Sequence, residues 1–286
     1  MKARQSLKHS ICRALSLGTA LALVATVTVA SASAAGLPAK YKAKGVITVA
    51  SDASYAPMEF VGNDGKTIVG ADVDLGHAIG KVLGVKFKFV NVSFDNIIPG
   101  LQSGKYDMGM SAFSDTKKRE QVVDFVTYLV AGTSFYVKNG GQKVEGLADL
   151  CGKTVAIEKG TIQVDDAIAQ NKKCTEAGKS PVTVSVFPDQ NGANLAIASG
   201  RAQVGMADSP VAAWIVKQSR GQFELSGKAY NNVPYGIIVP KDSGLAKPLR
   251  AAVEQLMKNG EYAKILAKWG ISQGALKTSQ INVAEQ

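Results

Sequence analysis

The chain carries an arginine where the electrostatics of a helix disfavour a cation. The run Ser111-Ala-Phe-Ser-Asp-Thr-Lys-Lys-Arg119 follows a short apolar strand predicted over residues 106–110, and Thr116 is a good N-cap for a helix. Arg119 would then lie in the first helical turn, where the positive end of the helix dipole opposes it. At a strand end, its planar guanidinium is suited to grip a carboxylate with two hydrogen bonds. The alternative is a solvated surface turn, which Arg119 alone does not exclude.

Polar residues follow several predicted strands, and in open α/β sheets ligands bind beyond the carboxyl ends of strands. Asp208 follows the strand predicted over residues 203–206, and Thr161 follows the strand predicted over residues 153–157. Arg119 and Asp208 therefore place opposite charges at two strand ends, which suits a zwitterion held between two lobes. Asp208 and Thr161 could instead simply cap the helices that begin after them. The other residues of this kind are Asp52, Ser111, Ser114, Glu158, Gly160 and Gln163.

Residues 1–35 have the pattern of a secretory signal peptide. Residues 14–30 are apolar and uncharged, and Ala32-Ser-Ala34 is a small-residue cleavage pattern. We expect cleavage and export; a membrane anchor is the alternative, but the apolar run is short and rich in Ala, Thr and Ser, which makes it a weak span. Cys12 precedes the run, so it is not placed for lipid attachment. The basic residues near the start are Lys2, Arg4, Lys8 and Arg13.

The residue types that many enzymes and nucleic-acid-binding proteins need are scarce. His77 is the one histidine after residue 35, and it falls off the apolar face of its predicted helix, so a Ser-His-Asp triad or a zinc site has no material. No Gly-rich phosphate loop of standard spacing occurs. The formal net charge is +10, but the basic residues are interleaved with acids and form no stripe with aromatics. We therefore expect no cofactor, no metal and no nucleic-acid partner.

Cys151 and Cys174 remain after the predicted cleavage. An even number of cysteines in an exported protein favours a disulfide, with two free buried thiols as the alternative. A closed loop of this length would stabilise the fold by roughly 3 kcal/mol in the chain-entropy model.

Strand and helix patterns alternate along the chain, which predicts an α/β fold. One amphipathic helix is predicted to begin at Asp72 or Asp74 and to end at Gly84. The same order of strand, loop and helix occurs in two successive blocks, which predicts two similar lobes with a boundary near residues 129–132. The predicted strands are residues 45–50, 86–92, 106–110, 133–137, 153–157, 182–187, 203–206 and 235–239.

Several motifs along the chain match one protein family. The strongest is Gly70-Ala-Asp-Val-Asp-Leu75 followed by Ile79, although the family's usual aromatic residue after the glycine is Ala71 here. The others are Asp52-Ala-Ser-Tyr-Ala-Pro-Met-Glu-Phe60, Leu101-Gln-Ser-Gly-Lys-Tyr-Asp107, Arg119 with Val123-Asp-Phe125, and Asn259-Gly260 before Tyr262 and Trp269. On these residues, over residues 45–270, the chain resembles periplasmic amino-acid-binding proteins of ABC importers, in the branch with the glutamine and lysine/arginine/ornithine/histidine binders.

The resemblance implies which residues bind a ligand. The family's ammonium-binding aspartate falls on Asp208. Its carboxylate clamp falls on Arg119 and Ser114, the backbone of Ala112, and the backbone amides of Thr161 and Ile162 at a helix start. Its side-chain pocket falls on Asp52, Tyr55, Phe94, Ser111 and Glu158. Two positions differ from the family pattern. Ile162 stands where some relatives have a residue with a hydroxyl, and Glu158 stands where relatives have a leucine or lysine.

The resemblance also implies the architecture and the partners. We expect a two-lobed, periplasmic-binding-protein-like fold of type II with two hinge crossings, near residues 129–132 and 227–231. Lobe 1 would comprise residues 36–131 and 232–286, and lobe 2 residues 132–231. The protein would be a periplasmic monomer without enzymatic activity, which captures an amino acid in the interlobe cleft and delivers it to the membrane permease of an ABC importer.

The residues at the side-chain end predict a ligand with a polar, cationic side chain. Asp52 and Glu158 would repel each other in a closed cleft unless a cation or several hydrogen-bond donors met them. The alternative is that Glu158 turns outward and Asp52 serves the backbone at a turn. An alternative from another class is an exported dehydratase of the cyclohexadienyl type on the same scaffold, with Glu158 as its general acid.

Overall fold

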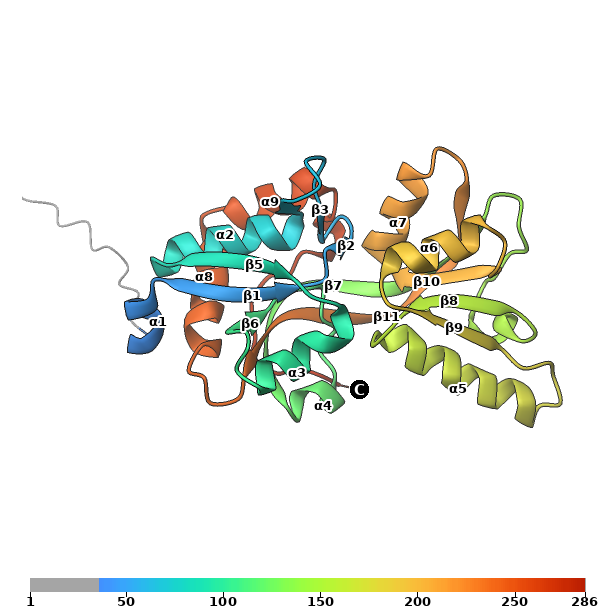
Figure 1. Ribbon diagram of the computed structural model, residues 1–286, viewed down its shortest axis with the longest axis horizontal. Coiled ribbons are helices and arrows are strands. Elements are labelled where there is room, and N and C mark those ends of the chain that lie inside the picture. The colour runs from blue at the N-terminus through green and yellow to red at the C-terminus, as the bar shows by residue number, and fades with distance from the viewer. Residues whose placement is uncertain (1–35, 286) are drawn as a thin grey trace, which may run out of the picture. The chain divides into compact units, whose positions relative to one another are not determined.

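The structure is a computed structural model, and it describes residues 36–285. An eight-stranded mixed sheet runs through it in the order β5-β1-β6-β11-β7-β10-β8-β9 (Figure 1). The strands are β1 Val46–Ser51, β5 Lys86–Asn91, β6 Met108–Gly109, β7 Val123–Lys138, β8 Thr154–Glu158, β9 Thr183–Phe187, β10 Val204–Asp208 and β11 Phe223–Pro240. The predicted α/β class is confirmed.

The middle of the sheet is an antiparallel pair of long strands, β7 and β11. On one side β1 pairs in parallel with β5 and β6, and on the other β8 pairs in parallel with β9 and β10. The register between β7 and β11 shifts between Ser226 and Tyr230 and again between Tyr230 and Val233. These irregular positions overlap the second predicted crossing, at residues 227–231.

Both central strands are longer than the sequence predicted. The predicted strands at residues 133–137 and 235–239 are only the outer parts of β7 and β11. Gly132 in β7, and Gly227, Asn231 and Pro234 in β11, are residues typical of loops, so the pattern broke where the chain remains extended. The three-stranded sheet of β2 Ser54–Tyr55, β3 Glu59–Val61 and β4 Ile68–Val69 was not predicted either, because its strands are too short to show a period.

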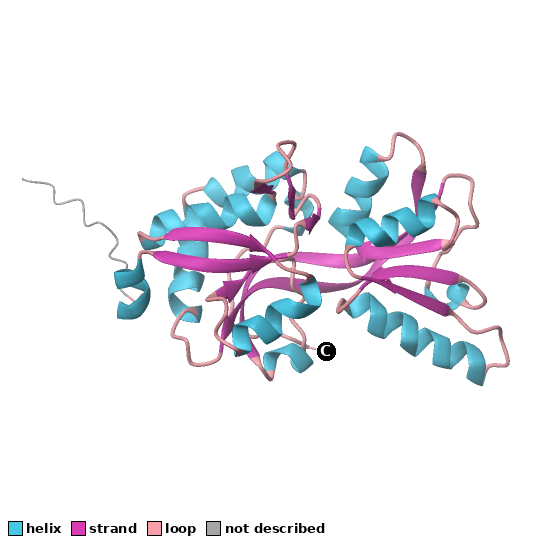
Figure 2. Cartoon of the chain, viewed as in Figure 1, coloured by secondary structure: helices cyan, strands magenta, loops and turns pink. Residues whose placement is uncertain are grey.

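Helices pack against the sheet on both of its faces (Figure 2). Beside β1, β5 and the first part of β7 these are α2 Ala71–Leu83, α8 Ala246–Lys258 and α9 Glu261–Trp269, which also contact one another. Beside β8, β9 and β10 these are α5 Ile162–Glu176, α6 Gln190–Ala198 and α7 Ser209–Gln218. The shorter helices are α1 Ala39–Lys44, η1 Phe94–Asn96, α3 Ile97–Gln102, α4 Lys117–Glu120, η2 Leu147–Leu150 and η3 Ser272–Gly274.

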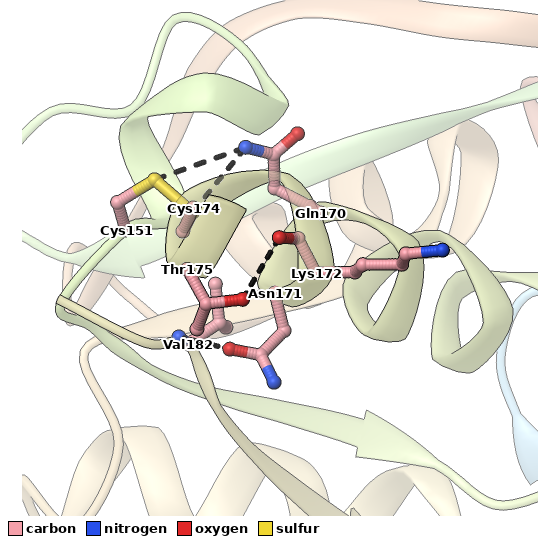
Figure 3. Close-up of a disulfide and its surroundings, with 7 residues drawn as sticks. All are labelled: Cys151, Gln170, Asn171, Lys172, Cys174, Thr175 and Val182. Carbon is pink, nitrogen blue, oxygen red and sulfur yellow. Dashed lines mark hydrogen bonds between the residues drawn. A yellow bond between two sulfur atoms is a disulfide. The ribbon is translucent and has the colours of Figure 1, made fainter. Parts of the chain in front are cut away.

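The predicted disulfide is confirmed. Cys151 follows η2 and Cys174 lies in the last turn of α5, with their Cα atoms 5.6 Å apart (Figure 3). Cys174 is buried in a cluster with Val155, Ile157 and Leu150, so the bond ties α5 to the strands that it covers.

Two predictions concern the ends of the chain and membranes. The predicted signal peptide, residues 1–35, lies outside the described residues. Within residues 36–285, no helix has both the length and the apolar character needed to cross a bilayer.

Candidate functional site

A small cavity gathers nearly all of the residues predicted to bind a ligand. Its walls come from the residue after β1, from β2, η1 and α4, from the segment between β6 and α4, from the start of α5, and from the ends of β8 and β10. They are Asp52, Tyr55, Phe94, Ala112, Ser114, Arg119, Glu158, Thr161, Ile162, Gln163 and Asp208. The volume in which the centre of a water molecule can move inside the cavity is about 10 Å³. The cavity therefore has room for about one water molecule.

Arg119 occupies the position that the sequence predicted. The Thr116 hydroxyl accepts a hydrogen bond from the Arg119 N–H at 3.3 Å, so Thr116 is the N-cap of α4. The guanidinium donates to the carbonyl of Ser114 at 2.9 Å and to the carbonyl of Gly160 at 3.0 Å. Burial lowers the pKa of Arg119 to about 10, so the side chain remains a cation at neutral pH. Two of its five N–H donors are used in this way, and no other described residue accepts a hydrogen bond from the guanidinium, which leaves donors for an anion.

Two aromatic rings support the guanidinium. Its central carbon lies 5.4 Å from the ring centroid of Phe94 and 5.3 Å from that of Phe113. The two rings stack on each other with their centroids 4.3 Å apart. Cation–π contacts of this kind hold a guanidinium in place while leaving its edge open for hydrogen bonds.

Asp208 does not serve as a helix cap. It stands at the N-cap position of α7, yet its side chain accepts no capping hydrogen bond. The carboxylate instead accepts from Nε2 of Gln163 at 2.7 Å and lies beside the hydroxyls of Tyr55 and Tyr235. Burial raises the pKa of Asp208, and the nearby charge of Arg119 acts in the opposite direction. The capping alternative is therefore excluded, and the carboxylate faces the cavity.

The first turn of α5 brings backbone donors to the same cavity. Thr161 is the N-cap residue, and its hydroxyl donates to the carbonyl of Glu158 at 2.8 Å. N–H groups in the first turn of a helix have no acceptor within the helix, and the helix dipole favours an anion there. The backbone of Ile162 and Gln163 therefore offers an anion site opposite Arg119.

The other end of the cavity holds carboxylates only. Asp52 is fixed by the backbone, because its two oxygens accept the N–H groups of Ser54 at 3.1 Å and Phe94 at 2.9 Å. Glu158 points inward and is only 2% exposed. Among the described residues, no group donates a hydrogen bond to its Oε1. Burial raises the pKa of Glu158 well above its usual value, and the charge of Asp52 adds to that effect.

The sequence missed a third carboxylate near this end. The charge of Asp189, which caps α6 through the N–H of Gly192, contributes to raising the pKa of both Asp52 and Glu158. Among the ion pairs between described residues, none includes Asp52, Glu158 or Asp189. Lys159, the residue after β8, pairs with Asp95 instead, at 2.7 Å.

The predicted roles of Ser111 and Ala112 need correction. Ser111 is not part of the cavity wall; its hydroxyl donates to Glu59 and accepts the N–H of Asp52. The N–H of Ala112 donates to the Asp72 carboxylate at 3.0 Å, so it is not available for a ligand carboxylate. Ala112 can offer the cavity only its carbonyl, which is an acceptor and suits an ammonium group.

Gln163 was considered as a strand-end residue but was not predicted to line the site. Its side-chain amide donates to Asp208 at 2.7 Å and to the Thr133 hydroxyl at 2.9 Å. It therefore orients the carboxylate of Asp208 toward the cavity.

Both the sequence and the fold of this chain are similar to those of known proteins. Residues 47–272 match the sequence profile of the bacterial extracellular solute-binding proteins, family 3. The arginine-binding protein ArgT of Corynebacterium glutamicum is 33% identical over 247 residues, which cover 86% of this chain and 81% of that protein.

Two solved structures are also similar. An ancestral arginine-binding protein bound to arginine has a TM-score of 0.73 and 36% identity, covering 79% of this chain and 98% of that one. The ancestral amino acid-binding protein AncCDT-1, described as a precursor of cyclohexadienyl dehydratase, has a TM-score of 0.72 and 32% identity, covering 80% of this chain and 97% of that one.

Proposed function

Because this chain belongs to the bacterial extracellular solute-binding proteins, family 3, we propose that it captures an amino acid in the cavity and delivers it to the permease of an ABC importer. One observation carries the proposal. Arg119 and the buried carboxylate of Asp208, two opposite charges from distant parts of the chain, line one small cavity. An amino acid carries the complementary pair of charges on a single carbon atom.

The α-carboxylate would bind between Arg119 and the first turn of α5. Arg119 would use N–H groups that do not contact Ser114 or Gly160, and the Ile162 and Gln163 backbone would complete the site. The α-ammonium would bind Asp208, with the carbonyl of Ala112 as a neutral acceptor. An analogue that lacks either group would leave a buried charge without its partner, which costs several kcal/mol.

The ligand side chain would extend between Tyr55 and Phe94 toward Asp52 and Glu158. A cationic side chain would neutralise two carboxylates that otherwise face each other. Arginine, lysine, ornithine and histidine carry such a group, whereas glutamine supplies only neutral donors. The similarity to arginine-binding proteins supports this choice.

The cavity must open before a whole amino acid can enter, since its free volume holds about one water molecule. In the proposed lobe division, hydrogen bonds, ion pairs and aromatic contacts join lobe 1 (residues 36–131 and 232–286) to lobe 2 (residues 132–231). The hydrogen bonds are the N–H of Asp208 on the Tyr55 hydroxyl at 3.0 Å, Arg119 on the Gly160 carbonyl, and the N–H of Gln190 on the Ser54 hydroxyl at 3.2 Å. The ion pairs are Lys159–Asp95 and Lys118–Asp165, and the ring of Trp214 lies near those of Phe60 and Trp269. Breaking these few contacts would let the lobes rotate about β7 and β11, near the register shifts in β11.

The protein would act as a periplasmic monomer without catalytic activity. The alternative of a cyclohexadienyl-type dehydratase rests on Glu158, a buried carboxyl with a raised pKa, and on the similarity to AncCDT-1. That relative is itself described as an amino acid-binding protein, and the pairing of Arg119 with Asp208 favours binding of an intact amino acid.

Thermal-shift screening of the chain from residue 36 tests the proposal. The twenty common amino acids, ornithine and citrulline would be compared, with agmatine as an arginine analogue that lacks the carboxylate. We expect cationic L-amino acids to raise the unfolding midpoint and agmatine to have no effect. If no amino acid raises the midpoint, amino-acid capture is wrong; conversion of prephenate or arogenate would favour the dehydratase.

A further inference from the structure

The motif Gly70-Ala-Asp-Val-Asp-Leu75 begins α2 beside the cavity, yet none of its residues lines the cavity. Its two aspartates have different partners. Asp74 accepts hydrogen bonds from Nζ of Lys268 at 2.6 Å and from Nε1 of Trp269 at 2.7 Å, so it anchors α9. Asp72 is completely buried and faces β3. The proposed function accounts for neither residue, and Asp72 lies behind the cavity wall.

The backbone forces Asp72 and Glu59 together. The N–H of Asp72 donates to the carbonyl of Met58 at 2.9 Å. Gly70 permits this approach, because its φ is +142° and a Cβ at this position would lie 2.1 Å from the same carbonyl oxygen. The start of β3 therefore lies against the first turn of α2, where Glu59 and Asp72 are both fully buried.

Each carboxyl group has one oxygen that accepts hydrogen bonds from Ser111, Ala112 or Tyr128, and one oxygen without a donor among the described residues. Glu59 Oε1 accepts the Ser111 hydroxyl at 2.8 Å, and Asp72 Oδ2 accepts the Ala112 N–H at 3.0 Å and the Tyr128 hydroxyl at 2.8 Å. Among the described residues, nothing donates to Glu59 Oε2 or to Asp72 Oδ1. The charge of Asp72 helps to raise the pKa of Glu59, so the two buried carboxyl groups are near each other. A single proton between Glu59 Oε2 and Asp72 Oδ1 would satisfy both oxygens.

We propose that Glu59 and Asp72 share one proton, and that this acid pair is a positioning device that holds Ala112 in the cavity wall and Ser111 behind it. The Ser111 hydroxyl also accepts the N–H of Asp52 at 2.9 Å, so the position of Asp52 depends on the same acid pair. Ala112 has a φ of 47°, a backbone conformation that residues with a Cβ rarely adopt. The Asp72 carboxylate holds Ala112 there, which turns its carbonyl toward the ligand ammonium. The effect on ligand binding rests on the proposed function; the shared proton does not.

The protonation of the pair has a definite consequence for stability. The titratable groups that face Glu59 are Asp72 from α2, Asp52 after β1, and the Tyr128 hydroxyl from β7. Burial raises the pKa of Glu59, and the charge of Asp72 raises it further. The folded protein then keeps a proton that the unfolded chain releases above the ordinary pKa of glutamate. The stability that Glu59 contributes is present at low pH and is lost as the pH rises toward its pKa in the folded protein. The unfolding equilibrium constant rises by up to tenfold per pH unit over this range.

Three single variants separate the shared proton from a general packing role. Glu59→Gln keeps the shape and the donor of a protonated glutamate, so it should retain the contacts to both Asp72 and Ser111. Asp72→Ala removes the acceptor of the Ala112 N–H and should release that N–H. Asp74→Ala, on the same helix turn, is the matched control, because the hydrogen bonds of Asp74 go to α9.

The experiment measures hydrogen exchange of the Ala112 amide by NMR in the ligand-free protein, and the pH dependence of urea unfolding between pH 6 and 8. Exchange at Ala112 should be at least tenfold faster in Asp72→Ala and unchanged in Glu59→Gln and Asp74→Ala. The unfolding equilibrium constant of the wild type should rise more steeply with pH than that of Glu59→Gln. The difference should be a factor of up to ten per pH unit. Equal slopes would overturn the shared proton, and equal exchange in all variants would overturn the positioning role. Both results are obtained without ligand, so they stand apart from any failure of the proposed function.

Discussion

The two ends of the cavity differ in how their charges are balanced. At one end Arg119 and Asp208 carry opposite charges, and each already contacts neutral partners such as the Gly160 carbonyl and the Gln163 amide. At the other end Asp52 and Glu158 are both acids, with no cation among the described residues paired to either. The balanced end matches the groups that every amino acid shares. The unbalanced end can distinguish one side chain from another.

This difference predicts two kinds of variant. Changes at the balanced end should weaken binding of every amino acid by a similar factor. Changes at the unbalanced end should alter the order of preference among amino acids.

The largest effect is expected for Asp208→Asn. A buried ammonium would lose its counter-charge, so affinity for every amino acid should fall by at least ~2 kcal/mol, about thirtyfold. Calorimetry measures the loss, and urea unfolding supplies the control. If Asp208 served only as a helix cap, asparagine would replace it equally well, and unchanged affinity would contradict the assignment.

Arg119→Lys should weaken all amino acids by about tenfold or more. A lysine ammonium is a point charge and cannot reproduce the two-pronged grip of the guanidinium on a carboxylate. The ratio of affinities between arginine and glutamine should stay the same, because this end does not contact the side chain. Calorimetry that shows binding within about twofold of wild type, or ~0.4 kcal/mol, would rule out Arg119 as the clamp.

Glu158→Gln should separate the two ends. Loss of this carboxylate should weaken arginine several-fold, up to about tenfold, and leave glutamine nearly unchanged or improved. Asp52 remains in the variant, but it is already engaged by the N–H groups of Ser54 and Phe94. An equal loss for arginine and glutamine in competition assays would show that Glu158 has a packing role instead.

The affinity for arginine should depend on pH. Burial raises the pKa of Glu158 above its usual value, so below that value the free protein must lose a proton when a cation binds there. Affinity should therefore increase as the pH rises from 6 to 8, by up to tenfold per unit. Glutamine is the control, because a neutral side chain requires no such proton loss. A flat profile for arginine would mean that Glu158 is already ionised before binding.

The comparison also shows what the sequence could predict. Arg119 and Asp208 were found because each follows a strand and sits beside a local signal: the Thr116 cap, or the start of a Ser-Pro helix. Local signals of this kind can be recognised from the sequence alone, because they involve only neighbouring residues. Cys151 and Cys174 were paired because no other cysteine follows the predicted leader.

The rest of the site depends on contacts between segments that are far apart in the chain. Ser111 meets Glu59 across 52 positions, and Gln163 meets Asp208 across 45. The sequence alone could not show that the Ser111 hydroxyl turns away from the cavity, or that the Ala112 N–H is used by Asp72. Asp189 was missed because its local pattern is that of a helix cap, which it also is. Its electrostatic effect on Glu158 arises only when β8 and β9 pair.

The most direct test of the account is the affinity of the chain from residue 36 for L-arginine and L-citrulline, measured by calorimetry in one buffer. Citrulline has nearly the shape of arginine and the same α-carbon groups, but its side chain is neutral. We expect arginine to bind at least tenfold more tightly, because only the cation compensates Asp52 and Glu158. Leucine and glutamate should bind more weakly than either. If leucine or glutamate binds more tightly than every cationic and amide amino acid, the assignment of the unbalanced end is wrong, although the amino-acid site at Arg119 and Asp208 would stand.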